Sequence, residues 1–263
     1  MVSILLILCL NQAFERYSVS ARATALAHAI TTQACGLDAV RFNPALLSHL
    51  QASHLGAGYE HFMSGLEGLH NIHVGFARPF LIGGIGVHLS EFGFSEQKEQ
   101  AITCSYGIKL SKDFSLGVGN DVYLINNART GTSFSYGINV AFLASVYKKW
   151  WLGVYGHNLN KPRFSDSDYG VLPYELRAGL GYHPFSDILS MAEISLIDDD
   201  MRIHLASEFN VLKIVQLRAG VKTNPTVVSG GLGIRITLIT TDYAIEYVPE
   251  LPLTHSITIS MTF

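Results

Sequence analysis

The sequence lacks the features that mark most helical membrane proteins and most nucleic-acid-binding proteins. Its 263 residues contain no apolar run of about 18 residues, the length that a helix needs to cross a bilayer. Any membrane crossing must therefore be made by strands. Charged residues make up only 15% of the chain, the net charge is -3 and no Lys/Arg cluster occurs, which argues against nucleic acid as a partner.

Cysteine is also scarce, and acidic clusters with metal-site spacing are missing. The three cysteines, Cys9, Cys35 and Cys104, are an odd number without CxxC spacing, so neither a disulfide framework nor a zinc site is predicted. The acidic stretches 166–168 and 198–200 lack the spacing of a calcium loop and are interpreted as solvated turns. No metal and no cofactor is expected.

Alternation of apolar and polar residues is what the chain has in abundance. In residues 254–263 one face carries Ile and Met and ends on Phe, and the other carries Ser and Thr, the period-two signature of a strand. About fourteen such segments follow one another from residue 54 onward. Their charged residues fall on the polar face, as lipid on the other face requires: Glu60, Lys109, Asp121, Glu175, Arg177, Glu193, Arg202, Glu208, Arg218, Lys222, Arg235, Asp242 and Glu246.

The connections between these segments alternate in length. Joints after even-numbered segments are mostly tight, whereas several after odd-numbered segments are long, notably 93–99 and 160–173. Barrels with both termini in the periplasm place short turns there and long loops outside. The sequence therefore predicts an all-β, transmembrane, up-and-down antiparallel β-barrel of about 14 strands in the outer membrane of a Gram-negative-type bacterium, with both termini periplasmic.

The first fifty residues differ from the rest. Residues 2–10 form an apolar run of signal-peptide length, although a positive n-region is missing and 11–13 is a poor cleavage site. We therefore expect a signal peptide, possibly truncated, over 1–19. Residues 20–50 are not strand-like, because 21–29 is alanine-rich and Asn43-Pro44 forces a turn. This segment is predicted to be a short hatch that precedes the barrel at 51–263.

Three stretches carry a resemblance to a known family. They are the Ser-Ala-Arg-Ala run at 20–23, the stretch 38–46 with its Asn-Pro-Ala, and the closing run 230–263. Together they resemble the FadL-like outer-membrane β-barrel superfamily, and within it the PorV/PorQ-type proteins.

The resemblance implies how the N-terminal segment and the C-terminus are used. The segment before the strands would fold into the barrel as a hatch, anchored by Asn43, Pro44 and Ala45. Phe263 would be the signal that the barrel-assembly machinery reads during insertion into outer-membrane lipid.

Three functions are weighed. PorV/PorQ resemblance implies an accessory, docking role in type IX protein secretion, with secretion components and secreted proteins as partners, and Phe92, Phe94 and Phe164 in predicted loops favour docking. The alternative is FadL-like passive transport of long-chain fatty acids or another hydrophobic small ligand through a hatch-gated barrel that opens laterally. An outer-membrane hydrolase rests only on His88 and Ser90, which share an inward face, whereas outer-membrane phospholipases place such a pair toward lipid. No catalytic residue is assigned, and no enzyme is expected.

Charges of both signs on the inward face predict a polar network that joins the wall to the hatch and plugs the lumen. Its members are expected to be Glu60, Asp121, Arg177, Arg202, Glu208, Arg218, Arg235 and Glu246. Lumen histidines are expected to serve as further hydrogen-bond partners: His54, His73, His157, His183 and His204.

Overall fold

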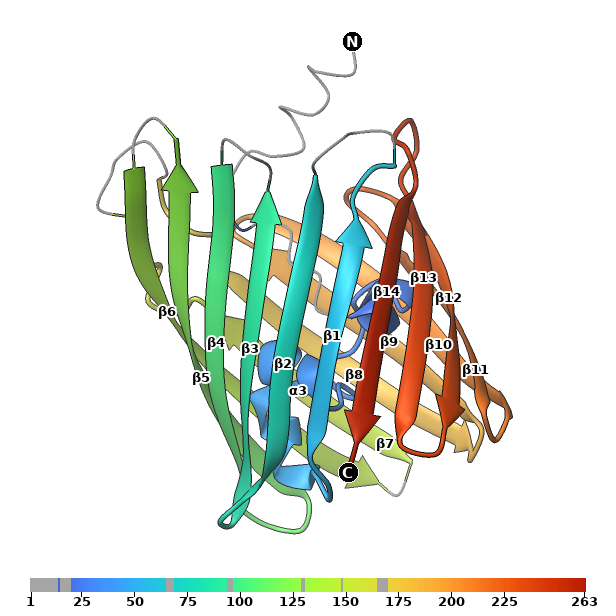
Figure 1. Cartoon of the computed structure of the whole chain (residues 1–263). Coiled ribbons are helices and arrows are strands. Elements are labelled where there is room, and N and C mark those ends of the chain that lie inside the picture. The colour runs from blue at the N-terminus through green and yellow to red at the C-terminus, as the bar shows by residue number, and fades with distance from the viewer. Residues whose placement is uncertain are drawn as a thin grey trace.

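The computed structural model describes Phe14 and residues 20–64, 69–93, 97–128, 131–147, 149–164 and 170–263. The predicted signal peptide, apart from Phe14, and the acidic stretch 166–168 lie outside the described residues. In the part described, fourteen antiparallel strands close into a barrel in which each strand pairs with its sequence neighbours and β1 pairs with β14 (Figure 1). The predicted all-β up-and-down barrel is thus confirmed. No helix among these residues is long and apolar enough to cross a membrane.

The strands vary in length, and their connections alternate as predicted. Five of the six two-residue joints follow even-numbered strands, namely 81–82, 148–149, 186–187, 213–214 and 237–238, and the sixth, 198–199, follows β9. The joints after even-numbered strands lie at the end of the barrel where the C-terminus lies (Figure 1). The strands are β1 (His54–His61), β2 (His70–Phe80), β3 (Gly83–Gly93), β4 (Gln97–Lys109), β5 (Phe114–Asn127), β6 (Gly131–Tyr147), β7 (Trp150–His157), β8 (Glu175–Phe185), β9 (Ile188–Ile197), β10 (Asp200–Leu212), β11 (Val215–Lys222), β12 (Val227–Ile236), β13 (Ile239–Tyr247) and β14 (Thr254–Thr262).

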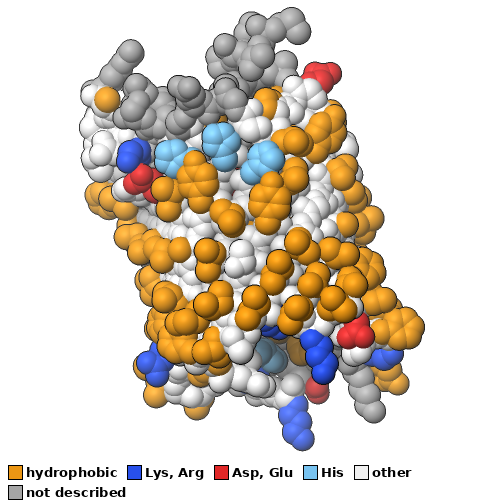
Figure 2. Space-filling model, turned by 45° about the vertical axis from the view of Figure 1, so that its right-hand side comes forward, with side chains coloured by type: hydrophobic (Ala, Val, Ile, Leu, Met, Phe, Trp, Pro, Cys, Tyr) orange, Lys and Arg blue, Asp and Glu red, His pale blue; other side chains and the backbone are white. Residues whose placement is uncertain are grey.

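The outer wall is apolar. Every strand exposes large apolar side chains on its outward face, Ile72 on β2 and Ile257 on β14 among them. Figure 2 shows apolar side chains spread over the face of the wall in view. Glu91 and Lys98 are exceptions near the long-loop end, where the Lys98 ammonium lies 2.8 Å from the Glu91 carboxylate. Such a belt matches the requirement that lipid places on a barrel wall.

The lumen is filled by the N-terminal segment, which we term the hatch segment (residues 20–50). It consists of α2 (Ala21–Ala25), α3 (Leu37–Phe42), the 3₁₀ helix η1 (Pro44–His49) and the connections between them. Helix α2 packs against β11 to β14, and η1 packs against β2 to β6. The hatch segment therefore bridges two opposite parts of the wall (Figure 1).

Local chemistry explains where α2 begins and ends. Ser20 is its N-cap, because the hydroxyl oxygen accepts the Ala23 N–H at 3.0 Å. The small alanines that follow let the helix lie close against the strands, and Ala21, Ala23 and Ala25 are fully buried. A left-handed backbone at position 27, with φ of 47°, then ends the helical run.

Three glycines in register form a flat patch of wall under η1. Gly84 on β3 pairs with Gly107 on β4, and Gly107 pairs in turn with Gly117 on β5. A Cβ atom at any of the three positions would overlap the η1 backbone at Pro44, Ala45 or Leu47. Only glycine lets two backbones approach this closely, so this glycine patch decides where η1 docks.

The replacement Gly107→Val is expected to push η1 off the wall. The added side chain must displace the Pro44 carbonyl, and overpacking of this kind costs about 1–3 kcal/mol. Hydrogen exchange followed by mass spectrometry should show faster exchange in residues 44–49. Gly230→Val is the control, because a Cβ there lies 3.7 Å from its nearest neighbour, which is ordinary contact. Unchanged exchange in Gly107→Val would contradict the assigned role of the patch.

Candidate functional site

Asn43 joins three parts of the molecule. Its amide nitrogen donates to the Thr31 carbonyl at 2.7 Å and to the Phe142 carbonyl on β6 at 3.3 Å. Its amide oxygen accepts the Ala45 N–H at 3.0 Å and so caps η1, whose first residue is Pro44. Asn43 and Ala45 are fully buried. The Asn-Pro-Ala triplet thus links the hatch segment both to itself and to the wall.

A first group of charges crosses from the hatch segment to the wall of β10, β11 and β13. The Arg22 guanidinium lies 2.9 Å from the Glu208 carboxylate, and Arg218 lies 2.6 Å from the same carboxylate. Arg218 also donates to Asp242 at 2.5 Å. We term these four residues the Arg218 cluster. Two cations and two carboxylates alternate in it, so the lumen charges here are mutually neutralised.

A second group is centred on Arg177 of β8. Its guanidinium lies 2.8 Å from both Glu175 and Glu193, and it donates to the His28 carbonyl at 3.0 Å. Glu193 also accepts the Thr31 N–H at 3.0 Å. Every member of this group therefore has a partner, and two of its bonds hold the hatch segment.

Asp121 on β5 is the centre of a third group, which the wall builds alone. Its fully buried carboxylate accepts from the Asn139 amide at 2.6 Å and from the Tyr123 hydroxyl at 3.1 Å, and it lies 3.1 Å from the His157 ring. The Thr103 hydroxyl donates to it as well. Tyr123 on β5 itself and three partners on β4, β6 and β7 fix this carboxylate.

The remaining predicted network members lie in different places. Glu60 is buried and Arg202 is half-buried on the lumen face, and Glu246 lies 3.8 Å from the Lys222 ammonium. Arg235 is exposed near the short joint 237–238, away from the Arg218 cluster. The structure therefore brings most of the predicted charges together but not Arg235.

The lumen histidines differ in their hydrogen-bond partners. His204 contacts the Ala27 carbonyl at 2.7 Å, His157 contacts the Tyr123 hydroxyl at 2.8 Å, and His54 contacts the Thr262 hydroxyl at 3.1 Å, as expected. The expectation is wrong for His73, because neither of its ring nitrogens has a hydrogen-bond partner in the described chain. The described bond of His183 comes from its backbone N–H, which donates to the Lys149 carbonyl.

His88 and Ser90 do not form a nucleophile pair. The His88 ring is fully buried and lies 5.7 Å from the His73 ring, centroid to centroid. Neither nitrogen of His88 has a hydrogen-bond partner among the described residues. Nucleophilic catalysis needs a base within hydrogen-bond reach of the hydroxyl, and this geometry does not supply one.

A packed apolar cluster lies on the lumen side toward the long-loop end. It consists of Phe14, Ala101 of β4, Tyr123 and Ile125 of β5, and Phe164 and Leu172 of the connection between β7 and β8. All six are buried. The cluster is therefore a water-excluding contact between the wall and the longest connection.

The aromatic residues that favoured protein docking do not form exposed loop tips. Phe92 belongs to β3 and packs on the lumen side against Phe62, with ring centroids 6.1 Å apart. Phe164 is only 6% exposed. The prediction of loop exposure is wrong for these two, and Phe94 lies outside the described residues.

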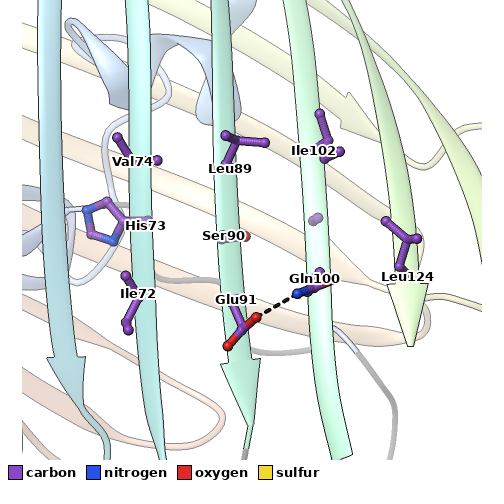
Figure 3. A pocket seen from close by; sticks show the side chains of 10 residues that line it. Ile72, His73, Val74, Leu89, Ser90, Glu91, Gln100, Ile102 and Leu124 are labelled. Atoms are coloured by element: carbon purple, nitrogen blue, oxygen red, sulfur yellow. Dashed lines mark hydrogen bonds between the residues drawn. The ribbon is translucent and has the colours of Figure 1, made fainter. Parts of the chain in front are cut away.

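A groove of about 330 Å³ opens on the lipid-facing side of the same part of the wall. Apolar side chains of β2 to β5 line it, and the Gln100 amide donates to the Glu91 carboxylate at 2.6 Å on its rim (Figure 3). Ala101 lines this groove and also belongs to the apolar cluster on the lumen side. The apolar lining consists of Ile72, Val74, Leu89, Ile102 and Leu124.

Phe263 lies at the short-joint end (Figure 1), and its side chain is 54% exposed. Its backbone pairs with Ser53 through two hydrogen bonds of 2.8 and 2.9 Å. These bonds fasten the last residue to the start of β1. The side chain is left accessible from outside the wall.

Comparison with solved structures identifies the fold. No protein-family model and no curated protein matches the sequence. Among solved structures, the toluene transporter TbuX of Ralstonia pickettii superimposes with a TM-score of 0.77 at 10% identity, covering 95% of this chain and 100% of that one. The toluene transporter TodX of Pseudomonas putida gives 0.70 at 11% identity, and a FadL homologue of Pseudomonas aeruginosa gives 0.67 at 12%; each match covers 95% of this chain and 99% of the other. The chain therefore has the fold of the FadL-type outer-membrane barrels of fourteen strands.

Proposed function

We propose that this chain is an outer-membrane channel that passes hydrophobic small molecules between its lumen and the membrane. The observation that carries the proposal is the position of Ala101. A packed apolar cluster lies on one side of this residue and an apolar groove on the other, so the wall is apolar on both faces at a position that carries a small side chain. Ligand sites are concave and mostly apolar, with volumes of roughly 300–1,000 Å³, and the groove falls within that range.

The hatch segment supports the same function by blocking a water-filled passage. It fills the lumen between opposite walls, and the Arg218 cluster and Arg177 hold it there. A hydrophobic ligand that leaves the lumen through the wall does not have to pass the hatch segment and its charged contacts. In this proposal Asn43, Pro44 and Ala45 anchor the hatch, as the family resemblance implies.

The proposal includes an orientation. Short joints mark the periplasmic end and the connection between β7 and β8 faces the cell surface, as in other outer-membrane barrels. The C-terminus is then periplasmic, and Phe263 is positioned for recognition by the barrel-assembly machinery. The apolar cluster that contains Phe14 lies toward the outer side, where a ligand arrives.

The neighbouring structures favour transport over secretion. TbuX and TodX are toluene transporters, and a third neighbour, CymD, is a monoaromatic hydrocarbon channel, with a TM-score of 0.69 at 13% identity. The docking role in type IX secretion stays a prediction of the sequence resemblance, and the burial of Phe164 removes part of its support.

Uptake by whole cells tests the proposal. Radiolabelled toluene and oleate are offered separately to a Gram-negative host whose own hydrophobic-substrate barrels are deleted, with and without this chain. We expect the chain to raise uptake of at least one probe, and Ala101→Trp to abolish the gain because the indole obstructs the wall between the apolar cluster and the groove. Ala192→Trp, on the lipid face of β9 outside the groove, is the control and should transport normally.

Two outcomes would contradict the proposal. Uptake of both probes equal to that of cells without the chain would exclude transport of these substrate classes. Full uptake by Ala101→Trp at normal expression would exclude the sideways route.

A further inference from the structure

The short-joint end of the barrel gathers basic side chains that are scattered along the sequence. They lie in the joints after even-numbered strands or in the last three residues of those strands, and all are exposed. We term them the basic rim: Arg78, Lys109, Lys112, Lys149, Lys213 and Arg235. In the same positions of the described chain, the exposed acidic side chains are Asp113 and Asp187. This end therefore carries an excess of positive charge.

The opposite end does not share this excess. In the described part of the connections after odd-numbered strands, Lys161 and Arg163 are exposed, and so are Asp198, Asp199 and Glu250. Cations and carboxylates nearly balance there. The positive excess is thus a property of one end of the barrel and not of its polar edges in general.

Large apolar side chains occupy the same short joints. Leu81 and Ile82 make up the whole joint between β2 and β3 and are 83% and 74% exposed. Leu110, Ile214 and Leu238, in three other short joints, are each more than half exposed. Turns that face water favour Gly, Pro, Asn, Asp and Ser instead. In Figure 2, Lys and Arg side chains stand among apolar ones at this lower end.

Apolar and basic side chains mixed in this way are typical of a membrane interface. The apolar side chains enter the edge of the hydrocarbon, while Lys and Arg keep their stems beside it and extend their charged heads to the lipid headgroups. The basic rim follows five of the seven even-numbered strands. Cations spread around the circumference in this way suit many separate lipids better than one compact protein surface.

We propose that the short-joint end is set into the headgroup layer and that the basic rim binds the phosphate groups of anionic phospholipids. Opposite charge selects the headgroup, and the exposed joint residues contact the upper part of the acyl chains. Each basic residue near an anionic membrane surface strengthens binding about fivefold. This lipid site is separate from the groove on β2 to β5 and does not depend on the transport proposal.

The chain carries its own probe of this end. Its two tryptophans, Trp150 and Trp151, are the first residues of β7 and directly follow Lys149. The neighbouring joint holds Lys112, and its Asp113 carbonyl accepts the Ser145 N–H of β6 at 2.9 Å. Trp150 is 36% exposed. Its fluorescence therefore reports on lipids beside Lys112 and Lys149.

Quenching by brominated lipids tests the proposal. The full chain is placed in phosphatidylcholine vesicles that contain increasing fractions of dibrominated phosphatidylglycerol or dibrominated phosphatidylcholine. At low salt we expect a preference for phosphatidylglycerol of about fivefold, the factor that one cation near an anionic surface contributes. In Lys112→Gln/Lys149→Gln the preference should fall close to one. Lys98→Gln/Lys161→Gln is the matched control, because it removes two exposed cations from the long-loop end, and it should keep the full preference.

Two results would overturn the proposal: equal quenching by the two lipids in the wild type, or an undiminished preference in Lys112→Gln/Lys149→Gln. A further arm separates lipid from a free anion. Sodium chloride should weaken the preference by screening, and inorganic phosphate at the same ionic strength should weaken it equally, because a free anion makes no contact with the apolar joints. Loss of the preference in phosphate alone would show that the basic rim binds the free anion and would overturn the assignment to lipid.

Discussion

Deletion of the hatch segment, residues 20–50, is expected to convert a closed barrel into an ion-conducting pore. The hatch segment packs against β11 to β14 on one side and against β2 to β6 on the other, so its removal exposes a lumen lined by charged side chains to water. Charged, water-filled barrel lumens conduct ions. Planar bilayer recordings should show almost no conductance for wild type and large, steady steps for the deletion variant.

Smaller changes at Asn43 give a graded form of this test. Asn43→Ala removes the helix cap and both bonds to carbonyl groups, whereas Asn43→Asp keeps the oxygen that accepts from Ala45. We expect brief openings in Asn43→Ala and fewer in Asn43→Asp. If the deletion variant folds as a barrel, by its mobility on unheated gels, and still fails to conduct, the hatch segment is not what closes the lumen.

Removal of the Arg218 side chain is expected to produce the largest loss of stability among single substitutions. Arg218 is 6% exposed and neutralises both Glu208 and Asp242. In Arg218→Ala the Asp242 carboxylate loses this ion pair and Glu208 keeps only Arg22, and breaking a buried pair in this way costs about 3–5 kcal/mol. The measurement is urea unfolding of the barrel in lipid vesicles, followed by circular dichroism.

Arg235→Ala provides the comparison for that experiment. This arginine also points from the polar face of a strand, but it is exposed near a short joint. Surface substitutions of this kind change stability by only about 0.5 kcal/mol. Equal losses in the two variants would mean that the Arg218 cluster contributes no more than a surface charge does.

The alternation of side chains made the wall predictable. Period two assigns each residue of a strand to one face independently of its partners, so the outward position of Ile257 and the inward position of Asp121 follow from local sequence. The same rule places Phe92 inward, since it shares parity with His88 and Ser90. We predicted a loop position for it, but β3 continues to Gly93.

Contacts between distant segments were not predictable in this way. Arg22 meets Glu208 across 186 positions of sequence, and alternation states only that Glu208 faces the lumen, not which cation reaches it. The glycine patch under η1 depends on strand register, which decides that Gly84, Gly107 and Gly117 lie side by side. Three glycines at inward positions of consecutive segments were the available signal, and they became meaningful only once the register was known.

The span of the hatch segment also bears on how the protein is assembled. Helix η1 packs on β2 to β6, whereas α2 packs on β11 to β14, so neither part of the wall alone forms the whole surface that the hatch segment contacts. These two parts of the wall are joined when β14 pairs with β1. We therefore expect the hatch segment to be fully seated only once the cylinder has closed.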